Sequence, residues 1–197
     1  MTTPTNARRR GLHLLPRDRT PDLTDRTSPA QLATAAATEA TERACPILEL
    51  TTGGFRYSEA FAGLTHDAVS GTVLLAHDRD RSRQRFSFDD LPVASGRYGV
   101  VLCDGVLEHV WLPLGVLIEL NRVSAPFARL YLAAPLTLPQ RGLTTRGHRQ
   151  SAGLNYLLEA AGFSIEQVNP MRGDCRYGVI ARKVRPRAAP IPGTDDT

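Results

Sequence analysis

Short apolar runs alternate along this chain with segments in which apolar residues recur every three or four positions. The runs predict buried β-strands and the recurring pattern predicts amphipathic helices. Strands with continuous apolar runs between helices are typical of a mostly parallel sheet that helices cover on both faces. We therefore expect an α/β domain whose ligands lie beyond the carboxyl ends of the strands.

The expected helices cover residues 30–43, 57–64, 112–123 and 151–161. The expected strands cover residues 46–50, 72–76, 85–88, 98–103, 129–134, 164–168 and 177–182. Ser28 and Pro29 are suited to begin the first helix, and Gly162 to end the last one. Only seven residues separate Asp78 from Phe86, whereas a helical crossover needs about a dozen. The helix here is therefore missing, or the third strand is absent or antiparallel.

Both ends of the chain differ in composition from its middle. Residues 1–28 are rich in Thr, Pro and Arg and predict a flexible basic arm, and residues 187–197 predict a disordered tail. Residues 29–186 then form one domain. The net charge is +4, yet residues 29–181 hold 14 basic and 15 acidic residues. The near-neutral core argues against nucleic acid as a partner, because such binding needs a basic surface.

Several classes of protein do not fit the composition. No stretch approaches the roughly 20 apolar residues of a membrane span, and no secretion signal is recognised. We expect a cytoplasmic protein without membrane contact. The three cysteines are isolated in sequence and form no metal-binding pattern. Cys45 and Cys103 fall in apolar runs, which favours buried thiols.

Three motifs between residues 91 and 163 occur in one known family. They are LPVASGRYGVVLCDGVLEHV at residues 91–110, ELNRV at 119–123 and GLNYLLEAAGF at 153–163. With them, residues 44–182 resemble the small-molecule type of class I S-adenosylmethionine-dependent methyltransferases. The resemblance implies a Rossmann-like, doubly wound sheet of about six to seven strands, shortened on the adenine side. It also implies S-adenosylmethionine as the cofactor and a small-molecule methyl acceptor as the substrate.

The first cofactor motif of that family is degenerate here. The family has an acidic residue followed by three alternating glycines, and the matching positions hold Glu49, Thr51, Gly53 and Phe55. Gly54 adds conformational freedom to the turn. Phe55 either fills the space for the amino-acid part of the cofactor, or turns into the core while Gly53 and Gly54 supply the turn.

The resemblance implies further cofactor contacts. Asp78 corresponds to the residue that holds the ribose hydroxyls, although it also fits a solvated charged loop. Asp89 or Asp90 corresponds to the acidic residue near the adenine amino group. Asp104 follows the central strand 98–103, at the edge where a substrate would lie. Gly99 replaces an Asp of the family at the start of that strand, a loss that we interpret as structural.

Methyl transfer is a direct displacement, in which positioning supplies much of the acceleration. A general base helps only where the acceptor carries a proton of high pKa. His109 is a candidate for that role, since the pKa of histidine is ordinarily near 6.5, but it also fits a role in orienting the local turn. His148 lies in the loop before the last helix and is the second catalytic candidate. Residues 136–150 fit either a substrate lid or a disordered loop.

Two functions therefore remain open. The first is an active methyltransferase that acts on a small molecule. The second is a catalytically inactive protein of the same fold, a pseudoenzyme that serves as a binding or regulatory subunit of a partner enzyme. A homo- or hetero-oligomer is compatible with both. The altered glycine motif and the shortened adenine side favour the second function, whereas the resemblance as a whole favours the first, and we therefore expect a methyltransferase with the pseudoenzyme as the alternative.

Overall fold

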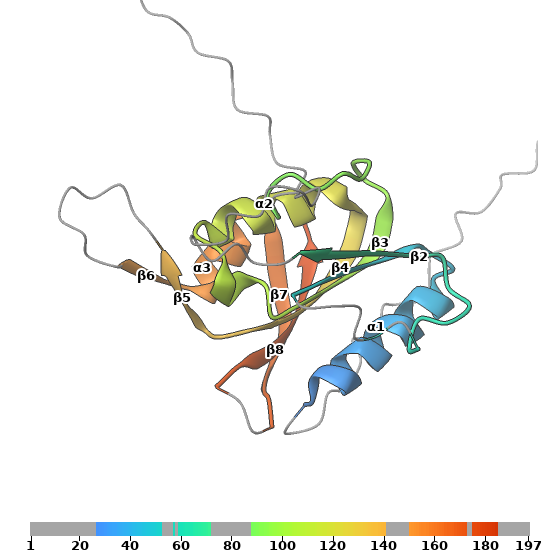
Figure 1. The fold of residues 1–197 in the computed structure, drawn as a ribbon, viewed down its shortest axis with the longest axis horizontal. Helices are drawn as coiled ribbons and strands as arrows, with labels where there is room; N and C mark the ends of the chain where they lie inside the picture. The colour runs from blue at the N-terminus through green and yellow to red at the C-terminus, as the bar shows by residue number, and fades with distance from the viewer. Residues whose placement is uncertain are drawn as a thin grey trace, which may run out of the picture.

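A six-stranded sheet organises the part of the chain that the structure, a computed structural model, describes. That part comprises residues 27–52, 57, 59–71, 88–140, 150–172 and 175–184. In chain order the elements are α1 (Pro29–Glu42), β1 (Ile47–Thr52), β2 (His66–Gly71), β3 (Tyr98–Asp104), the single-turn helix η1 (Leu107–His109), α2 (Pro113–Val123), β4 (Ser124–Ala134), β5 (Thr137–Gln140), β6 (Gln150–Gly153), α3 (Leu154–Ala160), β7 (Phe163–Pro170) and β8 (Tyr177–Lys183) (Figure 1).

The strand order in this sheet is β2-β1-β3-β4-β8-β7. The first four strands are parallel, and β8 is antiparallel to both β4 and β7. From β1 the chain moves to β2 on one side and later to β3 on the other. The strand order therefore switches between β1 and β3, where open α/β sheets bind their ligands. β1 and β3, at the expected strands 46–50 and 98–103, are thus adjacent and lie within the sheet.

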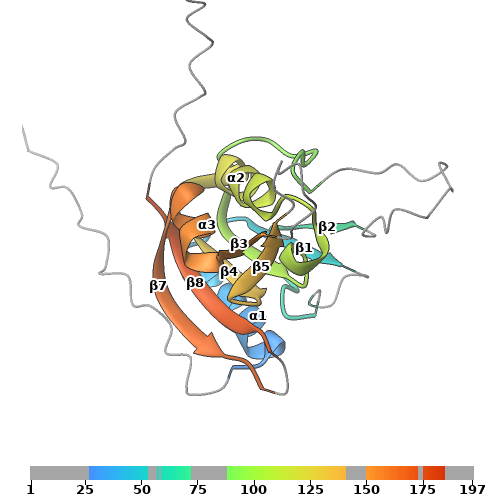
Figure 2. The same cartoon turned by 90° about the vertical axis from the view of Figure 1, so that its left-hand side faces the viewer.

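Helices cover both faces of the sheet (Figure 1). Helix α1 packs against β3 and β4 on one face, and α2 and α3 pack together on the other. Each face has its own core, since Val100 and Leu102 join the apolar residues of α1 while Val101 and Cys103 join those of α2 and α3. In Figure 2, β7 and β8 form a long curved pair at one edge of the sheet. A mostly parallel sheet between helices confirms the expected Rossmann-like α/β fold.

Helix α1 begins as the sequence predicts. The backbone N–H of Gln31 donates to Ser28 Oγ over 3.2 Å, and the backbone N–H of Ser28 donates to Gln31 Oε1 over 2.8 Å. This reciprocal pair satisfies two donors that the first turn of a helix leaves without partners. Its buried stripe contains Leu32 and several alanines, and these small side chains let the helix approach the sheet closely.

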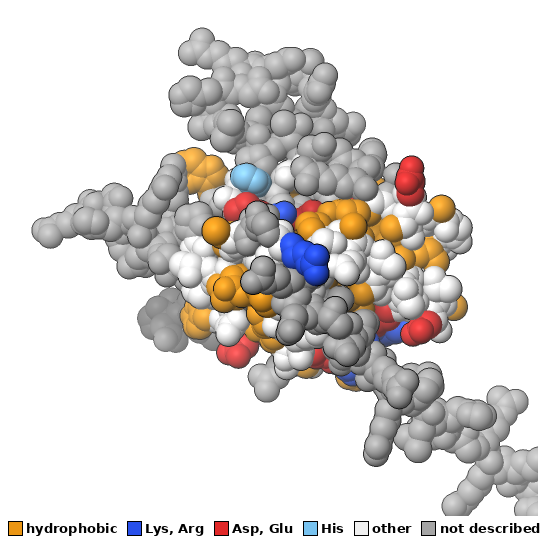
Figure 3. Space-filling view, turned by 90° about the horizontal axis from the view of Figure 1, so that it is seen from below, with side chains coloured by type: hydrophobic (Ala, Val, Ile, Leu, Met, Phe, Trp, Pro, Cys, Tyr) orange, Lys and Arg blue, Asp and Glu red, His pale blue; other side chains and the backbone are white. Residues whose placement is uncertain are grey.

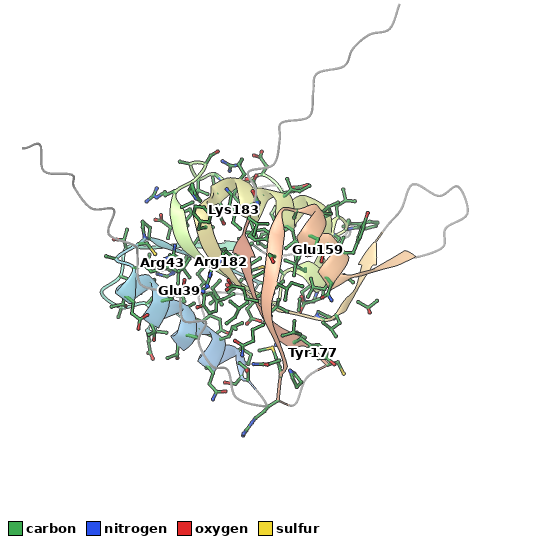
Figure 4. The ribbon with its side chains drawn as sticks, turned by 180° about the vertical axis from the view of Figure 1, so that it is seen from behind. Glu39, Arg43, Glu159, Tyr177, Arg182 and Lys183 are labelled. Carbon is green, nitrogen blue, oxygen red and sulfur yellow. The ribbon has the colours of Figure 1, made fainter. Side chains whose placement is uncertain are left out.

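A chain of buried and partly buried ion pairs fixes α1 to the sheet. Arg129 of β4 is 2% exposed and lies 3.2 Å from Glu39 of α1 and 2.8 Å from Glu166 of β7. Arg182 of β8 donates to the other oxygen of Glu166 over 2.5 Å, and the Tyr131 hydroxyl donates to Glu39. Figure 4 shows Glu39 and Arg182 on the same side of the sheet. The network joins one helix to three strands.

Two expected helices are corrected by the structure. Residues 57 and 59–64 form turns instead of a helix, and Gly63 has a φ of +83°, outside the helical region. The last helix begins at Leu154, three residues later than expected, because residues 150–153 form β6. β6 pairs with β5 in an antiparallel hairpin, so residues 137–140 and 150–153 of the predicted lid or loop are strands. Residues 141–149 lie outside the described residues.

The second strand also differs from its prediction. It runs over His66–Gly71 and pairs in parallel with β1, and its polar composition gave no strand signal. The predicted strand at 72–76 and most of the one at 85–88 lie outside the described residues, whereas Phe88 belongs to a turn. Within the described residues β2 is the edge of the sheet.

The described structure begins within the predicted arm. The Thr27 N–H donates to the Pro170 carbonyl and the Arg172 N–H donates to the Thr27 carbonyl, each over 3.1 Å. Thr27 thus pairs with the chain just after β7, and Ser28 caps α1. Residues 1–26 and 185–197, which contain the rest of the predicted arm and the predicted tail, lie outside the described residues.

Candidate functional site at the carboxyl ends of β1 and β3

The carboxyl ends of β1 and β3 lie side by side. Thr51 is the register partner of Asp104, and both side chains are buried. One residue further on, Thr52 Oγ1 donates to the Gly105 carbonyl over 2.6 Å. Gly105 has a φ of +68°, which side chains disfavour. The chain therefore turns sharply after β3 and directs the next residues over the switch point of the sheet.

Asp104 is the centre of this site. It is 2% exposed, and both carboxylate oxygens have protein partners. The Tyr57 hydroxyl donates to Oδ2 over 2.6 Å, and Arg176 Nη1 donates to Oδ1 over 2.7 Å. A buried carboxylate needs such partners to offset the loss of hydration. They hold its position and bring the turn before β2 and the start of β8 to the end of β3.

Glu108, in η1, shares the same arginine. Its Oε1 lies 3.7 Å from Arg176 Nη1. Its Oε2 is enclosed and has no hydrogen-bond partner among the residues that the structure describes. Burial raises the pKa of the Glu108 carboxyl, although Arg176 and His109 oppose this effect. Two carboxylates meet one guanidinium here, so a negative charge is left over when both carboxyls are ionised.

Glu49 lies on β1 and is fully buried. Its Oε2 is 3.2 Å from Nε2 of His66, the first residue of β2. The His66 ring packs against Phe61 at a centroid distance of 4.9 Å. The first acidic residue of the predicted cofactor motif is therefore in contact with a neighbouring strand.

Charge on the face that Figure 3 shows is mixed. Figure 3, seen from below, shows hydrophobic side chains in separate groups, with basic and acidic side chains among them. The described residues on this face therefore form no continuous basic surface of the kind that binds nucleic acid. Among the described residues, no group of three or more metal-binding side chains was found. None of the helices in that part of the chain is long and apolar enough to cross a membrane.

Solved structures with the same architecture include methyltransferases and a cyclase. An S-adenosylmethionine-dependent methyltransferase from Aquifex aeolicus aligns with a TM-score of 0.50 and 16% identity, over 81% of this chain and 100% of that chain. The trans-methyltransferase CalH, solved with S-adenosylhomocysteine, aligns with a TM-score of 0.53 and 15% identity over 79% and 55%. The [4+2]-cyclase SpnF aligns with a TM-score of 0.52 and 15% identity, over 77% of this chain and 79% of that chain.

This chain has the class I methyltransferase fold. The strand order, the antiparallel β8 and the structural neighbours agree on it. No protein-family model matches the chain, and no curated protein matches it significantly in sequence.

Three of the predicted cofactor residues lie on the central strands of the class I methyltransferase fold. Thr51 and Asp104 are brought together at the ends of β1 and β3, and Glu49 lies two residues before Thr51. The other two described carboxylates, Asp89 and Asp90, are exposed in the turn before β3, and the Asp89 side chain lies against Gly115 of α2.

The structure places the candidate catalytic residues, His109 and His148, less clearly at the site than Thr51 and Asp104. His109 ends η1 and is exposed, one residue after the half-buried Glu108. His148 lies outside the described residues, as do Gly53, Gly54, Phe55 and Asp78 of the predicted cofactor motifs. Their proposed roles stay predictions.

Tyr57 and Arg176 are the residues that sequence reasoning missed. They reach Asp104 from 47 and 72 residues away along the chain, and no local pattern connects such positions. Glu108 carries a weak signal, since it belongs to the LEHV motif directly after the central strand.

Proposed function

We propose that this chain is an S-adenosylmethionine-dependent methyltransferase that acts on a small molecule. One observation carries the proposal: the pairing of Thr51 with Asp104, which brings the ends of β1 and β3 together at the switch point of the sheet. Ligands of open α/β sheets bind at this point. The fold agrees, but a fold hosts several reactions, as the methyltransferase and cyclase neighbours illustrate. The residues of the site therefore have to support the choice.

The charge of the site fits a cationic methyl donor. Asp104 and Glu108 outnumber Arg176, and an excess negative charge attracts a positively charged sulfonium. Glu49, Thr51 and Asp104 would hold the cofactor. The predicted contacts of Gly53, Gly54, Asp78, Asp89 and Asp90 belong to the same proposal.

When bound, S-adenosylmethionine supplies a methyl group on a positively charged sulfur. The contribution of this chain is to hold the acceptor in line with that methyl group. Tyr57 and Arg176 fix the Asp104 carboxylate from two sides, so a group that binds there meets a rigid partner. Rigid placement matters because small displacements of reacting groups reduce the rate strongly.

Calorimetry with S-adenosylmethionine and S-adenosylhomocysteine tests the proposal. We expect micromolar binding of both by the full chain, and at least about a tenfold loss of affinity, or ~1.4 kcal/mol, in Asp104→Asn. Glu159→Gln is the matched control, because Glu159 is exposed on α3, and it should bind as the wild type does. Thermal unfolding confirms that each variant is folded. Absence of binding heat up to millimolar ligand in the folded wild type would contradict the proposal.

A second function is favoured by a different observation. Both oxygens of Asp104 already have protein partners, and Glu49 contacts His66. Acidic groups engaged in this way have less capacity to bind a cofactor. Together with Thr51 and Phe55 at glycine positions, this supports a catalytically inactive subunit of a partner enzyme. That alternative predicts a stable, folded chain that gives no heat with either ligand.

A further inference from the structure

One arginine lies between the two carboxylates that follow the central strand β3. Arg176 Nη1 is 2.7 Å from Asp104 Oδ1 and 3.7 Å from Glu108 Oε1. The residue directly precedes Tyr177, the first residue of β8, and its carbonyl accepts from the Met171 N–H over 3.0 Å. A distant part of the chain therefore brings a positive charge to the candidate site and fixes it there.

The guanidinium of Arg176 also lies over the turn after β3. A Cβ atom added to Gly105 would be 3.3 Å from Thr52 Oγ1 and 3.7 Å from Arg176 Nη1. Thr52 is the last residue of β1, and its hydroxyl donates to the Gly105 carbonyl. The positive charge is thus built in at the switch point of the sheet, beside the ends of both central strands. A cationic ligand at this point shares the two carboxylates with Arg176.

The charges of this cluster do not cancel. When both carboxyls are ionised, Asp104, Glu108 and Arg176 together carry one negative charge. Their field reaches the buried Cys103: burial raises the pKa of its thiol most, and the charges of Glu108 and Asp104 raise it further. Electrostatic interactions act over distance and need no contact. A ligand at the switch point therefore experiences the sum of the three charges, although Asp104 itself is enclosed.

S-adenosylmethionine and S-adenosylhomocysteine differ by one methyl group and by the positive charge on sulfur. The net negative charge of the cluster therefore favours the donor over the product. On the basis of the proposed function, we infer that Arg176 is a specificity-determining residue, which limits the preference of the site for the charged donor over the neutral product by cancelling one of the two carboxylate charges. Glu108 acts in the opposite direction and strengthens that preference.

A purely structural role of Arg176 makes a different prediction. The buried Asp104 carboxylate needs partners to offset its loss of hydration, and Arg176 is one of them. If this were its whole role, loss of the arginine would displace Asp104 and weaken the binding of donor and product by the same factor. The ratio of the two dissociation constants therefore distinguishes an electrostatic role from a structural one.

Calorimetry with the full chain measures this ratio in variants of the cluster. Low ionic strength limits screening, and mildly alkaline pH keeps Glu108 ionised although burial raises its pKa. Two unit charges about 10 Å apart change an equilibrium roughly four- to sixteen-fold at an effective dielectric constant of about 20–40. We therefore expect the preference for S-adenosylmethionine to rise at least about fourfold in Arg176→Gln and to fall at least about fourfold in Glu108→Gln. Arg176→Lys retains the charge and should stay close to the wild type.

Arg97→Gln is the matched control. Arg97 directly precedes β3, at the opposite end of that strand, and pairs with Asp67 over 2.7 Å. The variant removes the same charge from an arginine–aspartate pair away from the switch point, so its ratio should equal that of the wild type. Thermal unfolding shows which variants are folded. Glu108→Gln tests the inference independently and in the opposite direction, so the test does not depend on the folding of Arg176→Gln.

Three outcomes would overturn the inference. The first is a ratio in folded Arg176→Gln equal to that of the wild type, with both affinities lowered alike. The second is a ratio in Glu108→Gln that stays constant or moves toward the donor. The third is an equal change in Arg97→Gln, which would assign the effect to the charge of the whole protein. Failure of the proposed function is distinguishable from all three, because neither ligand then gives binding heat with the folded wild type.

Discussion

At the scale of single residues, Gly99 shows how a departure from a family pattern is compensated. The methyltransferases that the sequence resembles have an Asp at this position. Here a Cβ atom on residue 99 would lie 2.5 Å from Cys45 Sγ and 2.6 Å from Cys45 Cβ. The Cys45 side chain therefore occupies the space beside the start of β3, and burial raises the pKa of its thiol. The interpretation of Gly99 as a structural change agrees with this packing.

Replacement of Gly99 by Ala should therefore destabilise the fold. The added methyl group forces β3 or Cys45 to move, and such overpacking costs about 1–3 kcal/mol. Urea unfolding measures the change. Gly115→Ala is the control: its new Cβ would have ordinary contacts of 3.4 Å or more, and Ala in a helix gains about 0.5–1 kcal/mol over Gly. A free energy of unfolding of Gly99→Ala equal to that of the wild type would show that Cys45 does not occupy this space.

Some residues of the candidate site could be predicted from the sequence and others could not. Thr51 and Asp104 could be predicted as neighbours, because each ends an apolar run and parallel strands end at the same edge of a sheet. Tyr57 and Arg176 could not, since their positions depend on how a turn and the β7–β8 connection fold over that edge. The partners that satisfy Asp104 thus emerge only from tertiary structure.

At the scale of elements, β1, β3 and β4 were predictable because they are apolar on both faces. β2 was not, because His66, Asp67 and Ser70 interrupt its apolar pattern, and its pairing with β1 relies on backbone hydrogen bonds. The hairpin of β5 and β6 was not predictable for a similar reason. Its two strands, residues 137–140 and 150–153, have four residues each and no continuous apolar run. Helix α1 was predictable in extent, but the ion pairs that fix it to the sheet were not.

Arg129 is the residue on which the attachment of α1 depends. In Arg129→Met, Glu39 and Glu166 lose a buried cation, and the loss of one partner from a buried ion pair costs about 3–5 kcal/mol. Chemical denaturation should show this loss. Arg97→Met removes an ion pair whose two side chains are 46% and 38% exposed, and it should cost about 1 kcal/mol or less. Equal costs for the two variants would show that the buried network contributes no more than a surface pair.

At the scale of the whole molecule, the chain has the class I methyltransferase fold, and β2 is the edge strand of the part of the sheet that the structure describes. The switch point between β1 and β3 is retained, and so is the antiparallel β8. Structures of this architecture include a cyclase as well as methyltransferases, so the fold alone does not choose the reaction. The choice depends on whether the edge formed by Thr51, Asp104 and Glu108 accepts the methyl donor.

Backbone amide spectra of the isotope-labelled chain, recorded with and without S-adenosylhomocysteine, test that point most directly. The proposed site predicts that the largest shift changes occur at Thr51, Thr52 and residues 104–109, on both sides of the switch point. Amides of α3 and of β7, which lie away from that edge, should change little. Saturating ligand that leaves residues 51–52 and 104–109 unchanged, or that shifts only amides elsewhere, would contradict the assignment of a methyl-donor site to the ends of β1 and β3.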